Sequence, residues 1–417
     1  MTYVLEVNDS ELSLYRDESL EYHAPGIAVV RQGEILFGEP ALRLSRTHPR
    51  ETNQQYFARL NADPLAHPVT RASNHADLVY LHLQELQQIV QQAPAELVLA
   101  VPGILSADQL GVLLGIAQEC ALNVEGFVDS AVVAASLGDL PETTYHVDTL
   151  LQRACVTRLE NNAEVRRESA EEVSECGFAN LLDGWVNVIA DRFVRDTRFD
   201  PLHAAETEQQ LYNQVYDWVA AGDATQAEIG IEIDYRDHVR RVELPRSLLE
   251  EKAQQRFNQL RDALPTGTHV VLSARSARLP GMKQFLANNG HEFTALPGNA
   301  VAMGCTANMA DIRSPGGQLR LVSRLPRGAA LTSGDASARA PVREAPRPTH
   351  VLNNNTATRI DAADQILQLS ETEAGVMLDP PQDALLNGEK LTAQTRLQLG
   401  DEITAGSQRF VMIRVDD

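Results

Sequence analysis

The stretch that decides the fold is Val270-Val-Leu-Ser-Ala-Arg-Ser-Ala-Arg-Leu-Pro280. Its leading apolar residues predict a short strand that is buried on both faces. A turn of small residues follows, and Pro280 suits the first turn of a helix through residues 282–286. Open α/β sheets bind ligands where a strand passes into a helix. If the chain binds a nucleotide, we expect this turn to touch it, although it lacks the glycines that favour close approach of backbone to phosphate.

Composition limits the classes of partner. The chain has 417 residues and a formal net charge of -21, which disfavours nucleic acid or an anionic membrane as the main partner. Its four cysteines are scattered and have no paired histidines nearby, so we expect buried free thiols and neither a metal site nor a disulfide framework. No signal peptide and no run of 18 apolar residues is evident. We therefore expect a cytoplasmic protein without membrane insertion.

The order of predicted elements occurs twice. Residues 1–140 and residues 141–312 each predict three strands, followed by a helix, a strand and a helix. In the second half, a hairpin with one wet face is predicted at 228–234 and 239–244, and it leads into the helix 246–263. Sequence identity between the halves is negligible, so the repetition lies in the order of the elements. This pattern predicts an α/β fold with two related lobes.

The rest of the chain differs in composition. Residues 313–350 are rich in proline, alanine and arginine and poor in large apolar side chains, which predicts a linker. Residues 318–322 are the exception, because they can add one strand to what precedes them. The linker is basic on an acidic chain, and a solvated tether is favoured over a contact with an acidic partner. Residues 351–417 alternate short strands and turns, which predicts a small all-β sandwich.

The duplicated order resembles the ATPase domain of the actin and DnaK-type chaperone superfamily, a ribonuclease H-like fold. Phe127-Val-Asp-Ser-Ala-Val-Val-Ala-Ala-Ser136 is similar to the segment that reads NEPTAAALAY in the chaperones, and Pro297-Gly-Asn-Ala-Val-Ala-Met-Gly-Cys305 resembles PDEAVAYGAA. Four further segments resemble the family in the same order: 97–102, 107–124, 176–185 and 229–279. The resemblance covers residues 1–312 and implies two lobes with a cleft for ATP and Mg²⁺ between them.

The chain departs from the family at all three loops that hold phosphate. The first, D-x-G-T/S in the family, reads Glu6-Val-Asn-Asp-Ser10, and the second, D-x-G-G-G-T, reads Asp148-Thr-Leu-Leu-Gln-Arg153. The third, G-G-S, reads Ala274-Arg-Ser276, and residues 36–70 contain no lysine to match the one used in phosphoryl transfer. Because glycine lets backbone amides reach phosphate, the larger side chains, Leu150 and Leu151 among them, are expected to fill the phosphate space.

The resemblance defines a candidate nucleotide cleft. Alone, Asp129 is expected to have a structural and not a catalytic role. Arg275 and Arg278 are expected to pair within the protein, and gripping an anion is the alternative. No catalytic residue, metal or cofactor is expected, and ATP with Mg²⁺ belongs to the alternative function. The cleft residues are Glu6, Asn8, Asp9, Ser10, Asp129, Asp148, Thr149, Gly177, Ser273, Arg275, Ser276 and Arg278.

The C-terminal module resembles a forkhead-associated domain in residues 386–391 and 397–410. Phosphothreonine reading in that family uses a G-R pair and an S-x-x-H motif. The nearest match, Thr356-Ala-Thr-Arg359, lacks the glycine, and no S-x-x-H follows it. The resemblance therefore implies a degenerate interaction module, with Arg359 as the candidate residue for partner binding.

Together these features favour a non-enzymatic pseudo-ATPase: a scaffold or regulatory protein that docks a protein partner through the C-terminal module and the linker. The first alternative is a divergent ATP-binding, DnaK-like chaperone or nucleotide-switched regulator with weak ATPase activity. The second is an adaptor that binds phosphopeptides through the β-module. The retained family segments support the fold, and the three altered loops argue against phosphoryl transfer.

Overall fold

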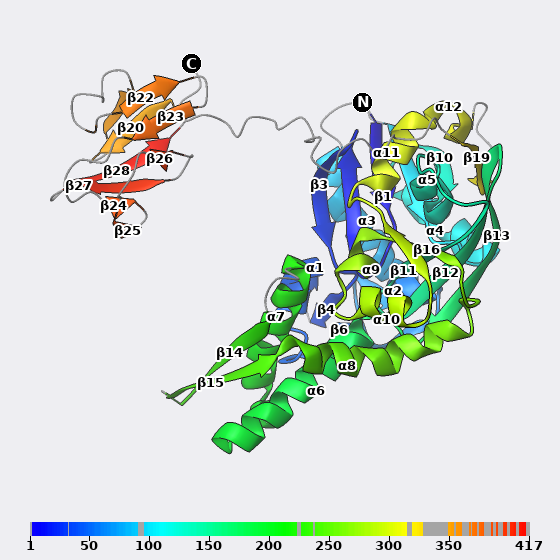
Figure 1. Cartoon of the computed structure of the whole chain (residues 1–417). Coiled ribbons are helices and arrows are strands. Elements are labelled where there is room, and N and C mark those ends of the chain that lie inside the picture. Colours follow the sequence, from blue (N-terminus) through cyan, green and yellow to red (C-terminus); the bar gives the residue numbers. More distant parts are fainter. Residues whose placement is uncertain are drawn as a thin grey trace. The chain divides into compact units, whose positions relative to one another are not determined.

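The computed structural model describes residues 2–31, 33–90, 96–222, 227–236, 238–314 and 319–327, and parts of the segment 349–413 (Figure 1). The chain forms two compact units, residues 1–332 and residues 333–417. The first unit is α/β, with helices packed on sheets that mix parallel and antiparallel strands. Within the described residues, no helix is both long and apolar enough to cross a membrane.

The first large sheet has the order β18-β10-β9-β1-β2-β3. The central strand β1 pairs antiparallel with β2, and β2 pairs antiparallel with β3. On its other side β1 pairs parallel with β9, and β9 with β10. Apolar side chains of the helices α3 (His75–Val90) and α4 (Ala107–Glu119) share one buried cluster with this sheet. The main strands are β1 (Thr2–Glu6), β2 (Leu12–Arg16), β3 (Ser19–Ala24), β9 (Glu96–Val101) and β10 (Val124–Asp129).

The second large sheet is β17-β16-β11-β12-β13-β19, and its first five strands repeat the order β10-β9-β1-β2-β3 of the first sheet. Its central strand β11 pairs antiparallel with β12, and β12 with β13, whereas β16 and β17 continue the sheet in parallel from the other side of β11. The strand predicted at 270–272 is therefore present as β16. The main strands are β11 (Thr143–Thr149), β12 (Arg153–Asn161), β13 (Glu164–Ser174), β16 (His269–Leu272) and β17 (Glu292–Ala295).

The helices of the second half pack around Trp185, which is fully buried. The predicted hairpin is confirmed as β14 (Glu228–Tyr235) and β15 (His238–Pro245). Two glutamines of one helix cover the outer edge of β14: Gln210 and Gln214 exchange hydrogen bonds with the backbone of residues 232 and 234 at 2.6–3.2 Å. The amide side chains thus satisfy backbone groups as a neighbouring strand would. The helices are α6 (Phe178–Thr197), α7 (Ala205–Ala221) and α8 (Arg246–Phe257).

The two large sheets share a buried cluster that includes two crossing helices, α5 (Ser130–Ala135) and α11 (Ala300–Ala307). The helices approach closely at Gly304. A Cβ atom at this position would lie 2.1 Å from the carbonyl oxygen of Val133. The absence of a side chain at Gly304 is therefore a condition for this crossing.

We expect Gly304→Ala to destabilise the first unit by about 1–3 kcal/mol, because the added methyl group forces the two helices apart. Gly115→Ala is the matched control: Gly115 also lies inside a helix, α4, and a Cβ atom added to it would meet nothing within 4 Å. The control should be unchanged or up to about 1 kcal/mol more stable. Urea unfolding of both variants tests this, and a neutral effect of Gly304→Ala would show that the crossing adjusts freely.

The segment after β3 forms small elements that pack against a fully buried histidine of α3, His82. Tyr22 Oη lies 2.8 Å from His82 Nε2, and Tyr56 Oη lies 2.8 Å from His82 Nδ1. The ring of Phe37 stacks on the imidazole with 4.8 Å between ring centroids. His82 thereby joins the helix α3 to this segment. The elements are β4 (Ala28–Arg31), β5 (Glu34–Phe37), α1 (Gly38–Leu42), β6 (Thr52–Asn53), α2 (Tyr56–Arg59), β7 (Pro64–Val69) and β8 (Ala72–Asn74).

Part of the expected linker 313–350 belongs to the first unit. The strand β18 (Leu321–Val322) pairs parallel with β10, and β19 (Arg324–Pro326) pairs antiparallel with β13. One short segment thus adds an edge strand to each large sheet, and residues 321–326 are part of the first unit and not of a linker. Residues 328–348 lie outside the described residues. The four cysteines are free and buried, as expected.

The second unit contains two sheets with the orders β21-β20-β28-β27-β24-β25 and β22-β23-β26. One buried cluster draws apolar residues from both sheets, among them Val351, Leu378 and Phe410. The strands are β20 (His350–Asn353), β21 (Thr356–Arg359), β22 (Leu369–Thr372), β23 (Gly375–Leu378), β24 (Leu385–Leu386), β25 (Glu389–Lys390), β26 (Thr395–Arg396), β27 (Glu402–Ala405) and β28 (Gln408–Ile413).

Candidate functional site

The turn after β16 is a short helix, α9 (Ala274–Arg278), and not the open turn that the sequence predicts. Ser273 caps it, because its Oγ accepts a hydrogen bond from the backbone N–H of Ser276 at 3.2 Å. The next helix, α10 (Met282–Asn288), begins after Gly281, whose φ is +82°. The prediction that Pro280 lies in the first turn of that helix is therefore wrong: the left-handed residue separates them.

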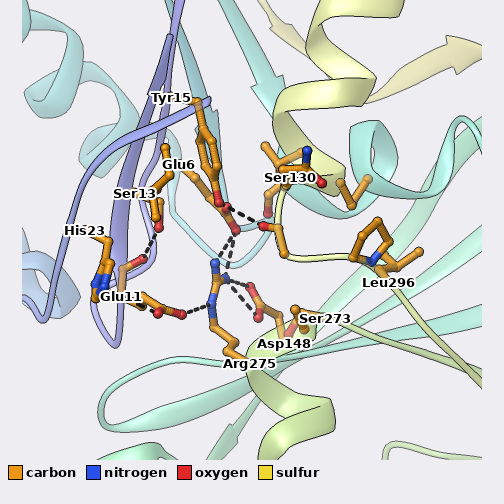
Figure 2. A pocket seen from close by; sticks show the side chains of 18 of the residues that line it. Glu6, Glu11, Ser13, Tyr15, His23, Ser130, Asp148, Ser273, Arg275 and Leu296 are labelled. Atoms are coloured by element: carbon orange, nitrogen blue, oxygen red, sulfur yellow. Dashed lines mark hydrogen bonds and ion pairs between the residues drawn. The ribbon is translucent and has the colours of Figure 1, made fainter. Parts of the chain in front are cut away.

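The guanidinium of Arg275 lies where β1, β11 and α9 meet (Figure 2). Its Nη2 lies 2.7 Å from Glu6 Oε1, and its Nη1 lies 3.1 Å from Asp148 Oδ2. Its Nε lies 3.6 Å from Glu11 Oε2. The side chains of Arg275, Glu6 and Asp148 are all at least nine-tenths buried. A single cation therefore joins the ends of two central strands that are 142 positions apart in sequence.

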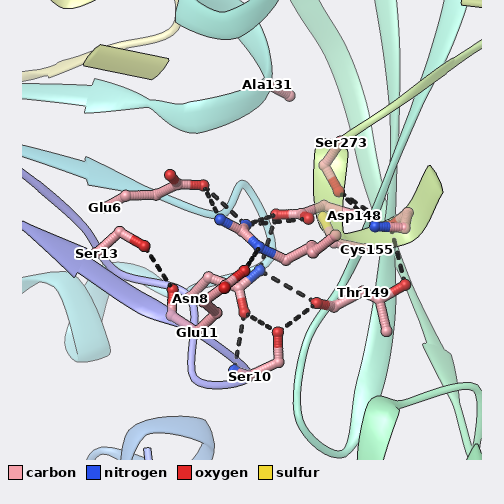
Figure 3. Close-up of polar contacts among 12 residues, drawn as sticks. Glu6, Asn8, Ser10, Glu11, Ser13, Ala131, Asp148, Thr149, Cys155 and Ser273 are labelled. Atoms are coloured by element: carbon pink, nitrogen blue, oxygen red, sulfur yellow. Dashed lines mark hydrogen bonds and ion pairs between the residues drawn. The ribbon is translucent and has the colours of Figure 1, made fainter. Parts of the chain in front are cut away.

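The turns after β1 and β11 also bond to each other directly (Figure 3). Asn8 Nδ2 donates to Asp148 Oδ2 at 2.9 Å and to the carbonyl of Thr149 at 3.2 Å. Ser10 Oγ donates to the same carbonyl at 2.8 Å. Asp9 Oδ1 accepts from the backbone N–H of Leu151 at 2.7 Å. The backbone N–H of Leu151, in a turn that the family resemblance assigns to phosphate, thus has a partner within the protein.

The side chain of Leu151, in the second turn, lies in the core of the second half. It is buried in the apolar cluster that contains Trp185. Leu150 is also buried. The expectation that Leu151 fills phosphate space is therefore wrong, and hydrogen bonds between the two turns, together with Arg275, close this region instead.

The charges of the cluster influence one another strongly. Burial raises the pKa of Glu6, and the guanidinium of Arg275 offsets only part of this effect. Burial also acts to raise the pKa of Asp148, but the guanidinium of Arg275 and the hydrogen bond from Asn8 outweigh it, so this pKa lies below the usual value. Burial raises the pKa of Asp9, whose Oδ2 is buried without a hydrogen-bond partner among the described residues. Burial acts to lower the pKa of Arg275, but the surrounding carboxylates outweigh it and raise this pKa, so the guanidinium stays charged.

The other predicted cleft residues divide into two groups. Thr149, Ser273 and Ser276 lie together, since Ser276 Oγ is 2.9 Å from Thr149 Oγ1 and 3.0 Å from Ser273 Oγ. Gly177 is instead the residue before α6, packed against the backbone of Gln152. A side chain at this position would collide with that backbone, so the glycine is required by packing within the second half.

Asp129 has the structural role expected of it. Its carboxylate is fully buried, and Oδ1 caps α5 by accepting from the backbone N–H groups of Ala131 and Val132 at 3.0 and 3.1 Å. Its Oδ2 lies 2.6 Å from Arg167 Nη1. Both carboxylate oxygens thus have protein partners, and the residue joins β13 to the start of α5.

Arg278 pairs within the protein, as does Arg275. Its Nη2 lies 2.8 Å from Glu11 Oε2, and its side chain is 39% exposed. Glu11 therefore serves both arginines. The prediction of pairing within the protein is confirmed for both residues. Arg359 lies on β21 in the second unit, in register with His350, and is exposed.

A cavity of about 290 Å³ adjoins the Arg275 cluster (Figure 2). Its walls come from β1, β2, β3, β11, α9 and the loop before α11, and they include Glu6, Glu11, Glu18, His146 and Leu296. On the side of Ser10 and Tyr216 the free space is only about 40 Å³. This second space is therefore too small for a nucleoside, whereas the first cavity accepts a small group.

Sequence reasoning missed Glu11, His146 and Tyr15. His146 had a detectable signal: it precedes Asp148 by two positions on a strand, so both side chains lie on one face. Tyr15 Oη donates to the carbonyl of Gly298 at 2.8 Å, a contact across 283 positions that no local pattern indicates. Glu11 follows the first turn and meets two arginines from α9.

Within the described ranges, no group of three or more histidine, cysteine, aspartate or glutamate side chains is arranged to hold a metal ion. No protein-family model matches the chain, and no curated protein matches it either.

Proposed function

We propose that this protein is a non-catalytic relative of the actin and DnaK-type fold, which serves as a scaffold for a protein partner. Two features support the duplicated, two-lobed fold. Each large sheet has three antiparallel strands followed by two parallel ones, in the same order. In addition, the turns that the resemblance assigns to phosphate come together at one place, beside the helix α9.

The observation that carries the proposal is the position of Arg275. Its guanidinium lies between Glu6 and Asp148, the residues that the resemblance matches to the carboxylates around the metal. A protein cation thus neutralises carboxylates that in an ATPase of this fold face Mg²⁺. Because phosphoryl transfer depends on positioned phosphates and a metal ion, the arrangement favours a closed scaffold over ATP hydrolysis.

The charge around the cavity supports the same conclusion. Its lining carries four carboxylates, Glu6, Glu11, Glu18 and Asp148, against two guanidinium groups, and both of these are paired. A nucleoside triphosphate in this cavity would face excess negative charge, and the lining contains no lysine to bind its phosphates. The structure of the cavity thus opposes an anionic ligand by both charge and available donors.

We expect millimolar ATP or ADP with Mg²⁺ to leave the thermal unfolding midpoint of the protein unchanged. A ligand that binds only the native state stabilises it by about 2.7 kcal/mol at one hundred times its dissociation constant, so even weak binding is visible. ATP turnover is measured in parallel on the protein and on Asp148→Ala. Magnesium-dependent turnover that disappears in the variant would overturn the proposal and favour the ATP-binding alternative.

We further propose that the second unit is a β-sandwich related to forkhead-associated domains and that it contributes to partner docking. The support is the single buried cluster that its two sheets share. The chemistry expected for phosphothreonine reading is incomplete around Arg359, so docking without a phosphate group is the favoured mode.

A further inference from the structure

The cavity beside Arg275 has the size of a small ligand site. Its volume of about 290 Å³ is far more than one water molecule occupies, about 30 Å³, and it approaches the lower end of ligand pockets, about 300 Å³. Figure 2 shows Glu6, Tyr15, Asp148 and Arg275 around it. Apolar side chains, among them Leu296, complete the wall. The cavity thus combines an apolar surface with several fixed polar groups.

The carboxylates of this cavity are only partly neutralised. Arg275 donates two hydrogen bonds to Glu6, and both go to Oε1, which leaves Oε2 outside this pairing. Glu18 lies at the exposed border and forms no ion pair among the described residues. With four carboxylates against two guanidinium groups, the lining retains acceptors for one further cation.

A buried imidazole provides an independent indication of a ligand. His146 lines the cavity and is 98% buried, since its exposed fraction is 2%. Its Nδ1 has no hydrogen-bond partner among the described residues. Burial lowers the pKa of this imidazole, so the ring is neutral and presents an acceptor nitrogen. Buried polar atoms of this kind are normally satisfied, and a bound donor would satisfy this one.

The exposed border of the cavity is an edge strand. β3 is the terminal strand of the first large sheet. Leu20 and His23 lie in this strand and Glu18 directly precedes it, and all three line the cavity. Leu20 is a large apolar side chain with 49% exposure. An extended peptide that adds to such an edge makes backbone hydrogen bonds and places alternate side chains in adjoining pockets.

We propose that this cavity receives the arginine or lysine side chain of an extended segment of a partner protein, which pairs with the edge of β3. The guanidinium or ammonium group would lie against Glu18 and the Oε2 atom of Glu6, and its N–H groups would reach the neutral His146. The apolar stem would pack against Leu296. This inference rests on the proposed function, because a cavity filled by nucleotide phosphate would not be open to a cation.

The test is calorimetric titration of the full chain with a capped pentapeptide, Thr-Val-Arg-Val-Thr, and with the same peptide carrying citrulline in place of arginine. We expect the arginine peptide to bind at least tenfold more tightly than the neutral citrulline peptide. We expect Glu18→Lys to weaken arginine-peptide binding by at least tenfold. Glu171→Lys is the matched control: Glu171 is exposed on β13, away from this cavity, and its substitution should change affinity less than twofold.

Equal binding of the two peptides, or no binding of either, would overturn the inference. Agmatine, a free guanidinium compound, tests whether pairing with β3 adds to the affinity. If agmatine binds as tightly as the arginine peptide, β3 contributes nothing and a partner segment is excluded. ATP titration of the same samples distinguishes a failure of the proposed function from a failure of this inference. A thermal shift with ATP would refute the proposed function, whereas peptide failure without such a shift refutes this inference alone.

Discussion

Arg275→Met is expected to lower the free energy of unfolding of the first unit by about 3–5 kcal/mol. The substitution keeps an apolar side chain of similar reach but leaves Glu6 and Asp148 as buried carboxylates without their cation. Breaking a buried ion pair by removing one partner has this cost because the remaining charge stays desolvated. Both tryptophans of the chain, Trp185 and Trp218, lie in the first unit, so their fluorescence during urea unfolding reports on it.

The loss of unfolding free energy in Arg275→Met should depend on pH if it arises from lost charge, and not if it arises from lost packing. Without the guanidinium, burial raises the pKa values of Glu6 and Asp148 in the folded state above those in the unfolded state. The folded variant then binds more protons than its unfolded chain, so its stability relative to the unsubstituted protein rises as the pH falls from 7 to 5. A deficit that is independent of pH would show that packing, and not charge, is what Arg275 supplies.

Two variants serve as controls for Arg275→Met. Removing the charges together, in Arg275→Met with Glu6→Gln and Asp148→Asn, should restore at least half of the lost stability, because no buried charge remains uncompensated. Arg278→Met removes a neighbouring arginine of the same helix, but its side chain is 39% exposed. The expected loss is therefore only about 0–1 kcal/mol. Equal losses for the two arginines would contradict the role assigned to Arg275.

Local sequence patterns predict much of the fold. The apolar run at 270–272 predicts the correct strand, because a strand buried on both faces selects β-branched residues. Alternation over 228–244 predicts the correct hairpin for the complementary reason, since one of its faces is buried and the other is wet. The α9 helix escapes prediction because Ser273 can cap a helix as readily as it can occupy a turn. β18 lies within the strand expected at 318–322, whereas β19 is obscured by a composition typical of linkers.

The candidate site is predictable in its membership but not in its contacts. The resemblance places Glu6, Asp148 and Arg275 in one cleft, and the structure brings them together. The pairing itself spans 269 positions between Arg275 and Glu6, and nothing local to either residue specifies it. The direction of the Leu151 side chain is likewise set by the core around Trp185, a tertiary effect. Residues whose partners are distant in sequence thus require the folded chain.

His82 shows the same limit, and it leads to a second large effect. A lone histidine in a helical pattern gives no sign that it is the centre of a buried network, yet the structure places it between Tyr22 and Tyr56. Burial lowers the pKa of His82 from 6.5 to about 3. Below pH 6.5 the unfolded chain binds a proton at this residue that the folded chain does not bind. The folded state is therefore expected to lose stability as the pH falls from about 6.5 toward 3.

The expected size of the His82 contribution is about 1.4 kcal/mol per pH unit within that window, so about 2–3 kcal/mol between pH 6 and pH 4. Other groups titrate in the same range, and His82→Gln isolates the histidine: its amide keeps one donor and one acceptor for the tyrosines but carries no proton equilibrium. Urea unfolding at pH 4, 5, 6 and 7 should give a shallower fall in stability for His82→Gln. His203→Gln, at an exposed position, is the matched control and should follow the unsubstituted protein. If the curves of His82→Gln and the unsubstituted protein run parallel, the imidazole already takes up a proton in the folded state, and the buried network is open to water.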